Sequence, residues 1–152
     1  MAHYVATVRS PLPPAQAFAK MADVERFSEW DPGVIRAARI PGSGPGVGTA
    51  YDLTVKAGST SVMRYAVTEI DAPRRVVLVA RTLWLTSVDE IRVEAAPGGS
   101  TVVYDATLTL NGPLRLFDPV LGLAFRRIGD RAAAGLRRFL GRAASGERGV
   151  TA

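Results

Sequence analysis

The chain has 152 residues, 47% hydrophobic and 22% charged, which fits one globular domain with a substantial core. It contains no cysteine, which excludes disulfides, thiolate metal sites and cysteine nucleophiles. The net charge is +5, and 17 of the 19 basic residues are arginine, but no recognition helix, zinc finger or RNA-binding signature accompanies them. We therefore expect no nucleic-acid partner, and we interpret the arginines mainly as a solvated surface.

The first forty residues predict one strand, two short helices and a second strand. Residues 3–10 alternate in polarity, and the prolines that follow end this strand. Residues 15–22 and 24–30 then read as short helices, and Asp31-Pro32-Gly33 stops the second one. Residues 34–40 predict the next strand.

A glycine-rich segment, residues 41–48 (PGSGPGVG), follows that strand. Its spacing does not match a dinucleotide fingerprint, because Val47 and Thr49 occupy the places where the third glycine would be needed, and no Gly-Lys-Ser/Thr is present. We interpret it as a hairpin loop over the mouth of a cavity.

The middle of the chain reads as five further strands separated by short turns. Short turns favour antiparallel pairing, and one-sided alternation indicates that one face of the sheet is wet. The predicted strands are residues 51–57, 61–70, 75–85, 87–95 and 101–110.

A long amphipathic segment, from Gly112 to about Ala144, closes the chain. Its apolar residues recur at the helical spacing of three and four, and arginines occupy a separate arc. With only strands and short helices upstream, this stripe must be buried against a curved sheet, which leaves room for a cavity. We expect Pro119 to separate a short first turn from the main helix. The apolar stripe consists of Leu121, Phe125, Ile128, Ala132, Leu136 and Phe139.

Residues 1–144 are therefore expected to form a single domain and residues 145–152 a loose tail. The N-terminus lacks a basic segment followed by an apolar one, and the apolar run of residues 76–80 is too short to span a bilayer. A cytoplasmic protein is the resulting expectation.

Four motifs in this order resemble the START-like, or birch-pollen-allergen-like, helix-grip superfamily, also called SRPBCC or polyketide cyclase/dehydrase. The resemblance covers nearly the whole chain. It implies an α+β fold in which a seven-stranded curved antiparallel sheet, with two short helices after its first strand, surrounds a long C-terminal helix and encloses an apolar cavity. The motifs shape turns and packing, so no catalytic residue is carried over with them. They are Pro14 with Phe18, the segment 27–32 (FSEWDP), the segment 46–49 (GVGT) and the segment 65–75 (YAVTEIDAPRR).

Alternation along the strands selects the candidate site residues. Asp89 shares parity with Ile91 and should face the cavity, where an apolar wall raises the pKa of a carboxyl and suits it to acid–base work. Tyr104 is the second candidate catalytic residue. Each tyrosine on an apolar face offers a ring and a hydroxyl that can orient a ligand. The expected ligand-binding residues are Tyr51, Tyr65, Trp84, Asp89, Tyr104, Leu121, Phe125 and Ile128.

Other polar residues are assigned no role in a site. His3, the only histidine, is expected at the surface, and one histidine without cysteine argues against a metal site. Arg64 and Arg81 fall on faces interpreted as outward, and Trp30 is expected to pack the short helices. No cofactor is expected.

Three functions stay open at this point. The leading hypothesis is a protein that binds a small hydrophobic molecule, such as a lipid or polyketide, in the cavity between sheet and helix. The second is a polyketide cyclase or dehydratase that uses cavity acid and tyrosine residues. The third is lipid transfer at anionic membrane surfaces through the arginine face of the helix.

Overall fold

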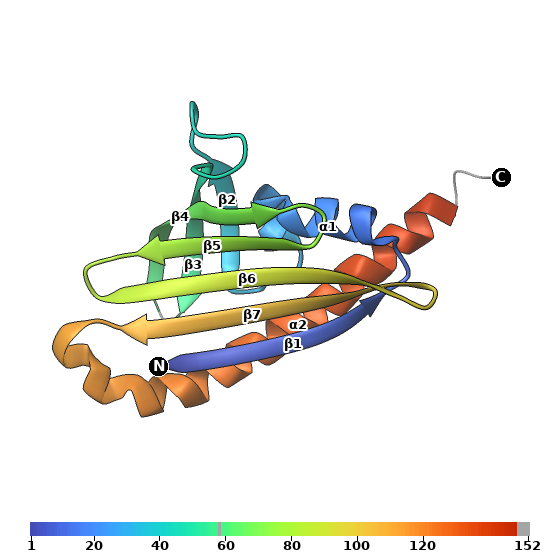
Figure 1. Ribbon diagram of the computed structural model, residues 1–152. Coiled ribbons are helices and arrows are strands. Elements are labelled where there is room, and N and C mark those ends of the chain that lie inside the picture. Colours follow the sequence, from blue (N-terminus) through green and yellow to red (C-terminus); the bar gives the residue numbers. More distant parts are fainter. Residues whose placement is uncertain (58, 149–152) are drawn as a thin grey trace.

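The computed structural model describes residues 1–57 and 59–148 and shows a seven-stranded antiparallel sheet with one long helix across it (Figure 1). The strands follow one another in the order β1-β7-β6-β5-β4-β3-β2, so each neighbour in the chain is a hairpin partner except β1, which pairs with β7. The predicted helix-grip fold is thereby confirmed. Its elements are β1 (Ala2–Ser10), α1 (Pro14–Ala22), η1 (Val24–Glu29), β2 (Val34–Arg39), β3 (Ala50–Ala57), β4 (Ser59–Asp71), β5 (Arg75–Arg81), β6 (Leu85–Ala96), β7 (Gly99–Leu110), η2 (Gly112–Phe117) and α2 (Asp118–Arg148).

The two short helices close one end of the space between the sheet and α2. Helix α1 begins at Pro14, where the missing N–H costs nothing, and it buries Ala17, Phe18 and Met21. The 3-10 helix η1 buries Val24 and Phe27. Trp30 follows directly and is 2% exposed, with its ring 5.0 Å from that of Phe27, so its predicted packing against the short helices is confirmed.

Helix α2 approaches the rest of the molecule closely at two glycines. At Gly135, a Cβ atom would lie 1.9 Å from the backbone oxygen of Trp30. At Gly129, a Cβ atom would lie 2.4 Å from the ring of Tyr4, whose hydroxyl donates to Asp130 Oδ1 at 2.9 Å. The absence of a side chain at these two positions therefore sets how near the helix lies to β1 and to η1.

Burial along α2 is uneven. The core contains four buried residues of the helix, Ala132, Leu136, Phe139 and Leu140. Phe125, about two helical turns before Ala132, is only half-buried. The second half of the described helix is thus packed tightly, and the first half borders space that side chains do not fill.

Some element boundaries differ from the predicted ones. Residues 112–117 form the separate 3-10 helix η2, and Pro119 lies in the first turn of α2, where proline is tolerated. The helix continues to Arg148 and includes residues 145–148 of the predicted tail, while residues 149–152 lie outside the described residues. Strand β5 ends at Arg81, four residues before the predicted end.

The glycine-rich loop does not cover the cavity, contrary to prediction. Gly42, Gly44, Gly46 and Gly48 all have positive φ, and the loop folds on itself through Thr49 Oγ1, which donates to the oxygen of Gly46 at 2.7 Å. The loop therefore projects from the β2–β3 edge of the sheet (Figure 1).

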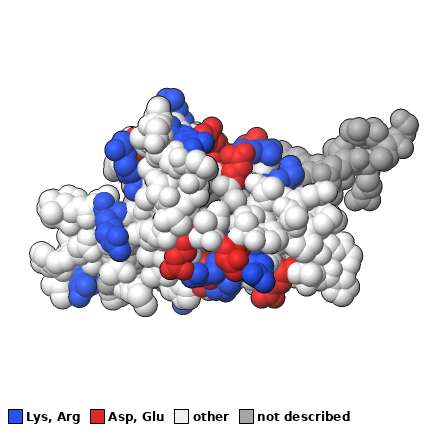
Figure 2. All heavy atoms as spheres, turned by 45° about the horizontal axis from the view of Figure 1, so that its top comes forward, with Lys and Arg blue, Asp and Glu red and all other residues white. Residues whose placement is uncertain are grey.

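Basic and acidic side chains lie next to one another in two areas of the face in Figure 2, along its lower middle and near its top, and residues of other kinds cover the rest. Arg64 forms two hydrogen bonds with Asp52, at 2.8 and 3.0 Å, and Arg75 bridges Glu69 and Glu90. These ion pairs place opposite charges side by side on the strands. On α2, Arg126, Arg127, Arg131, Arg137 and Arg138 are exposed, as the amphipathic pattern predicts.

The close approach at Gly135 generates a stability prediction. Replacing Gly135 with alanine places a methyl group against backbone atoms of Trp30, which cannot rotate away, so we expect a loss of at least about 2 kcal/mol in the free energy of unfolding. Gly122→Ala is the matched control, because no atom lies within 4 Å of the place that its Cβ would take and alanine favours helix by up to about 1 kcal/mol. Urea denaturation of both variants measures the difference, and equal stabilities would contradict the proposed contact.

Candidate functional site

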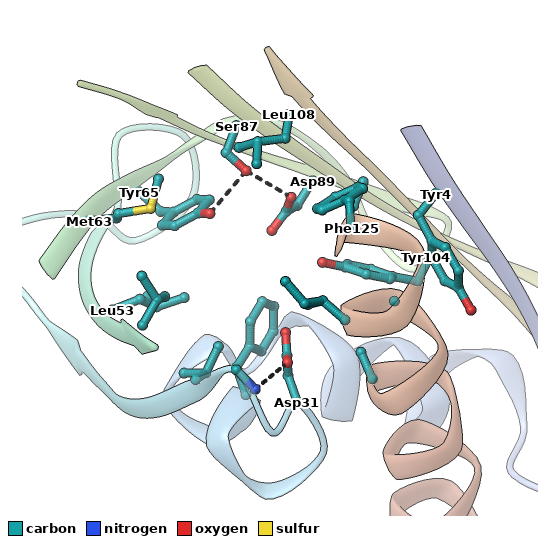
Figure 3. Close-up of a pocket in the computed structure, with 18 of the residues that line it drawn as sticks. Tyr4, Asp31, Leu53, Met63, Tyr65, Ser87, Asp89, Tyr104, Leu108 and Phe125 are labelled. Atoms are coloured by element: carbon teal, nitrogen blue, oxygen red, sulfur yellow. Dashed lines mark hydrogen bonds between the residues drawn. The ribbon is translucent and has the colours of Figure 1, made fainter. Parts of the chain in front are cut away.

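A cavity of about 140 Å³ lies between the concave face of the sheet and the first half of α2 (Figure 3). Its wall is mostly apolar and includes residues from β1, β3, β4, β6, β7, η1 and α2. The side chains of Asp31, Tyr65, Ser87, Asp89 and Tyr104 add polar groups to this wall. The apolar lining residues include Phe27, Val34, Leu53, Met63, Ala106, Leu108, Phe125, Ile128 and Ala132.

Three strands bring a connected set of polar side chains to one place in the cavity. Tyr65 on β4 donates its hydroxyl hydrogen to Ser87 Oγ at 3.0 Å, and Ser87 on β6 donates to Asp89 Oδ1 at 3.4 Å. The hydroxyl of Tyr104 on β7 lies near the Asp89 carboxyl and influences its pKa. Figure 3 shows the hydroxyls of both tyrosines pointing into the cavity near Asp89. We call Tyr65, Ser87, Asp89 and Tyr104 the polar cluster.

Burial dominates the protonation of Asp89. The residue is 7% exposed, and the pKa of its carboxyl is raised to about 7, mainly by the loss of hydration and secondly by the negative charge of Asp31 on the other side of the cavity. The neighbouring hydroxyls of Ser87 and Tyr104 act in the opposite direction and lower this pKa. Asp89 can therefore both release and accept a proton near neutral pH.

Asp31 is a second carboxyl with an altered pKa. Burial raises its pKa, and the backbone N–H of Gly33, which donates to Asp31 Oδ1 at 2.8 Å, acts in the opposite direction. Burial also raises the pKa of the hydroxyls of Tyr65 and Tyr104, with the charge of Asp89 adding to the effect. Both tyrosines therefore remain hydrogen-bond donors at any physiological pH.

The structure places five of the predicted ligand-binding residues on the cavity wall and three elsewhere. Tyr65, Asp89, Tyr104, Phe125 and Ile128 line the cavity. The other three, Tyr51, Trp84 and Leu121, are not part of its lining.

Each of these three differences has a structural reason. Trp84 is 59% exposed, because β5 ends at Arg81 and the alternation used to place Trp84 does not continue through the turn. Tyr51 does face inward and packs against the core, but it lies near Asp23 and Glu25, where η1 covers the sheet. Leu121 is half-buried and precedes the part of α2 that borders the cavity.

Four polar residues of the cavity wall, Tyr4, Asp31, Lys56 and Ser87, are absent from the predicted set. Ser87 shares strand parity with Asp89, so alternation is sufficient to find it. Asp31 belongs, by its sequence, to the turn that ends the second short helix. Its place opposite Asp89 depends on how the η1–β2 turn packs below the sheet, and the sequence pattern carries no signal for that contact.

Exposed apolar side chains gather at the end of the molecule formed by the β5–β6 turn, η2 and the start of α2. The backbone N–H of Asn111 donates to the oxygen of Trp84 at 2.7 Å and so joins the turn to the chain entering η2. The predicted lipid contact concerned the arginine face of α2 and stays a prediction. Within residues 1–57 and 59–148, no helix combines the length and apolarity needed to cross a membrane. The exposed residues are Leu83, Trp84, Leu116, Phe117, Val120 and Leu123.

The described residues also contain no group of three or more histidine, aspartate or glutamate side chains arranged to hold a metal ion. The chemistry that the cavity offers is therefore built from carboxyl and hydroxyl groups: a carboxyl that exchanges its proton near neutral pH, and hydroxyls that donate hydrogen bonds inside an apolar enclosure.

A curved antiparallel sheet that holds one long helix around an apolar cavity defines the helix-grip class of proteins. Within this class, the chain belongs to the family described as polyketide cyclase / dehydrase and lipid transport, which matches residues 1–141. No curated protein sequence matches the chain.

Solved structures of this class share the fold at low sequence identity. The Zhui aromatase/cyclase from Streptomyces sp. R1128 aligns with a TM-score of 0.75 at 15% identity, covering 92% of this chain and 93% of that one. A START superfamily protein from Mycobacterium smegmatis gives 0.74 at 14% identity, covering 94% and 99%. The chain spans 51% of the di-domain aromatase/cyclase StfQ of the steffimycin pathway, with 97% of this chain covered, a TM-score of 0.71 and 16% identity. At these identities the similarity establishes the fold.

The raised pKa of Asp89 predicts how stability depends on pH. In the folded protein this carboxyl has a pKa of about 7, whereas the ordinary pKa of an aspartate is 3.8. Between these two pH values the folded state therefore binds more protons than the unfolded state, and the stability of the fold falls as pH rises. Asparagine does not titrate, so Asp89→Asn removes this pH-dependent loss of stability. We expect the stability of Asp89→Asn relative to the wild type to increase by on the order of 3 kcal/mol from pH 4 to pH 8.

Chemical denaturation across this pH range measures the effect. Asp71→Asn provides the control, because Asp71 is exposed at the β4–β5 turn and pairs only with Arg74 there. Parallel pH profiles for Asp89→Asn and the wild type would contradict a raised pKa at Asp89.

Proposed function

We propose that the protein binds a small hydrophobic molecule carrying at least one oxygen atom in the cavity between the sheet and α2. The observation that carries this proposal is the polar cluster inside an otherwise apolar wall. Protonated Asp89 and the hydroxyl of Tyr104 can donate hydrogen bonds in this desolvated place, where a bond to a carbonyl or hydroxyl oxygen orients a ligand strongly.

The arrangement of burial supports the same proposal. If α2 served only to complete the core, its whole apolar stripe would be buried. Phe125 and Ile128 are instead half-buried where they border the cavity. Filling the cavity with an apolar ligand removes these side chains from water and stabilises the complex by about 25 cal/mol for each Å² buried.

A cavity-filling variant tests this function. We expect 2-naphthol, a neutral aromatic alcohol, to shift the amide resonances of Ser87, Asp89 and Leu108 in a ¹⁵N-labelled sample. Ala132→Leu should abolish these shifts, because Ala132 is 2% exposed on the cavity wall and the larger side chain occupies the ligand's space.

Ala124→Leu is the matched control for this experiment, since Ala124 is exposed on the same helix. It should leave the shifts intact. The thermal midpoint of each variant verifies that it is folded. Native mass spectrometry of the purified protein gives an independent readout, and the absence of both shifts and any lipophilic ligand would overturn the proposal.

A polyketide cyclase or dehydratase is the second candidate function, favoured by the pKa of Asp89. An ionised Asp89 can remove a proton from a carbon next to a ketone, and protonated Asp89 can return a proton to a departing hydroxyl. Tyr104, which keeps its proton, can donate a hydrogen bond to the enolate oxygen that develops between these steps.

An isosteric pair of variants tests this candidate. With a β-hydroxyketone substrate that the wild type converts, Asp89→Asn should lower kcat at least about 100-fold while preserving binding. Asp105→Asn should change it little, because Asp105 faces the opposite side of β7, where it contacts His3 at 2.7 Å. Turnover by Asp89→Asn equal to that of the wild type would remove Asp89 from the mechanism.

A further inference from the structure

A second hollow adjoins the cavity and differs from it in charge. It has a volume of about 320 Å³ and is lined by Pro32, Gly33, Lys56, Ile128 and Arg131. Gly33, Lys56 and Ile128 also line the cavity, so the two hollows share part of their walls. The second hollow, which we call the cationic mouth, thus lies where the end of β3 and the turn before β2 meet α2.

The backbone at the cationic mouth is held by hydrogen bonds on both sides of Gly33. The N–H of Gly33 donates to Asp31 Oδ1 at 2.8 Å, and the N–H of Lys56 donates to the oxygen of Gly33 at 2.8 Å. The starting point of the Lys56 side chain is therefore fixed relative to the cavity. Arg131 projects from α2 one turn before the tight contact at Gly135.

Both cations lack an acidic partner among the side chains that the structure describes. Three other cations on the strands do have acidic partners: Arg64 pairs with Asp52, and Arg75 and Arg92 both pair with Glu90. The acid nearest to Arg131 in the chain, Asp130, accepts a hydrogen bond from Tyr4 on β1. Two unpaired cations therefore flank one opening.

Charge inside the cavity is of the opposite sign. Asp31 and Asp89 both face the cavity, and Lys56, at its border, is the only basic residue among the described residues of its wall. Inside the cavity an anionic group would lose its hydration next to two buried acids, whereas at the cationic mouth it is attracted by the exposed side chains of Lys56 and Arg131. A ligand with one charged end would consequently bind with that end outward.

The size of the cavity points to the shape of the part that enters it. A volume of about 140 Å³ is close to that of an engineered apolar cavity, about 150 Å³, that takes up benzene. The cavity therefore accommodates one aromatic ring or a short hydrocarbon segment, and the rest of a larger ligand must extend into the cationic mouth.

From these observations we propose that the ligand is an apolar carboxylic acid whose hydrocarbon part fills the cavity and whose carboxylate lies between Lys56 and Arg131. This inference rests on the proposed binding function and adds the ligand's charge, its orientation and two specificity-determining residues. The hydrocarbon part supplies affinity through burial, and the cation pair distinguishes the acid from a neutral molecule of the same shape.

Two probes with the same hydrocarbon body and different charge test the inference. Isothermal titration calorimetry at pH 7 and low salt compares 2-naphthaleneacetic acid with its neutral counterpart, 2-(2-naphthyl)ethanol. We expect the acid to bind at least about tenfold more tightly, and we expect this advantage to shrink as salt screens the exposed cations.

Charge-removing variants locate the effect. Lys56→Gln and Arg131→Gln keep long polar side chains, and each should weaken binding of the acid about three- to tenfold without changing that of the alcohol. Arg138→Gln is the matched control. It removes the same charge from an exposed position of α2 that is not part of the cationic mouth, and it should change neither affinity.

The outcomes separate this inference from the function on which it rests. If the acid and the alcohol bind equally, and the two variants bind the acid as the wild type does, the cationic mouth is not a carboxylate site although the cavity binds ligand. If neither probe binds to the folded wild type, the binding function itself fails. An equal effect of Arg138→Gln would show long-range attraction rather than a local site and would overturn the inference.

Discussion

The contact between Trp30 and α2 determines the geometry on which the rest of the structure depends. The indole ring lies between the rings of Phe27, at 5.0 Å, and Tyr104, at 5.3 Å, while the backbone oxygen of the same residue faces Gly135 too closely to admit a Cβ atom. One residue thereby joins the short helices, the sheet and the long helix. Because the helix is held at this point and at Gly129, where it meets Tyr4 on β1, its second half packs into the core, while Phe125 and Ile128 in its first half border the cavity.

The same arrangement explains why polar groups can persist in an apolar space. Buried hydroxyl and carboxyl groups are costly unless they are hydrogen-bonded, and the polar cluster meets this condition in part through the bonds from Tyr65 to Ser87 and from Ser87 to Asp89. The remaining cost appears as a raised pKa at Asp89, which keeps this carboxyl largely neutral below pH 7. When Asp89 is protonated, it and a neighbouring tyrosine hydroxyl can donate hydrogen bonds to an oxygen atom of a ligand. The same groups can also take part in proton transfer.

Binding and catalysis therefore make different demands on the same residues, and the cationic mouth bears on both. As a binding site, the cavity needs only donors and an apolar wall. As an enzyme, it also needs the reacting carbon of the substrate to lie beside Asp89. A carboxylate held between Lys56 and Arg131 would fix one end of the ligand and so determine which part of its body reaches the polar cluster. None of the exposed apolar residues around Trp84 and Phe117 lines the mouth, so contact with a surface there need not obstruct entry of a ligand.

The sequence by itself determined the fold and part of the site. Alternating strands, short turns and one amphipathic helix permit few arrangements, and strand parity placed Tyr65, Asp89 and Tyr104 correctly because a side chain's face follows directly from its position in a regular strand. Strand alternation gave the wrong position for Trp84, because β5 ends before this residue. The sequence pattern also does not show how far the cavity extends, so Tyr51 and Leu121 were expected on its wall although they are not part of its lining. Only the tertiary structure decided that Asp31 lies opposite Asp89 and that Lys56 lies near Arg131. These pairs come from segments distant in sequence, and their approach is set by glycine contacts and side-chain volumes that no local pattern records.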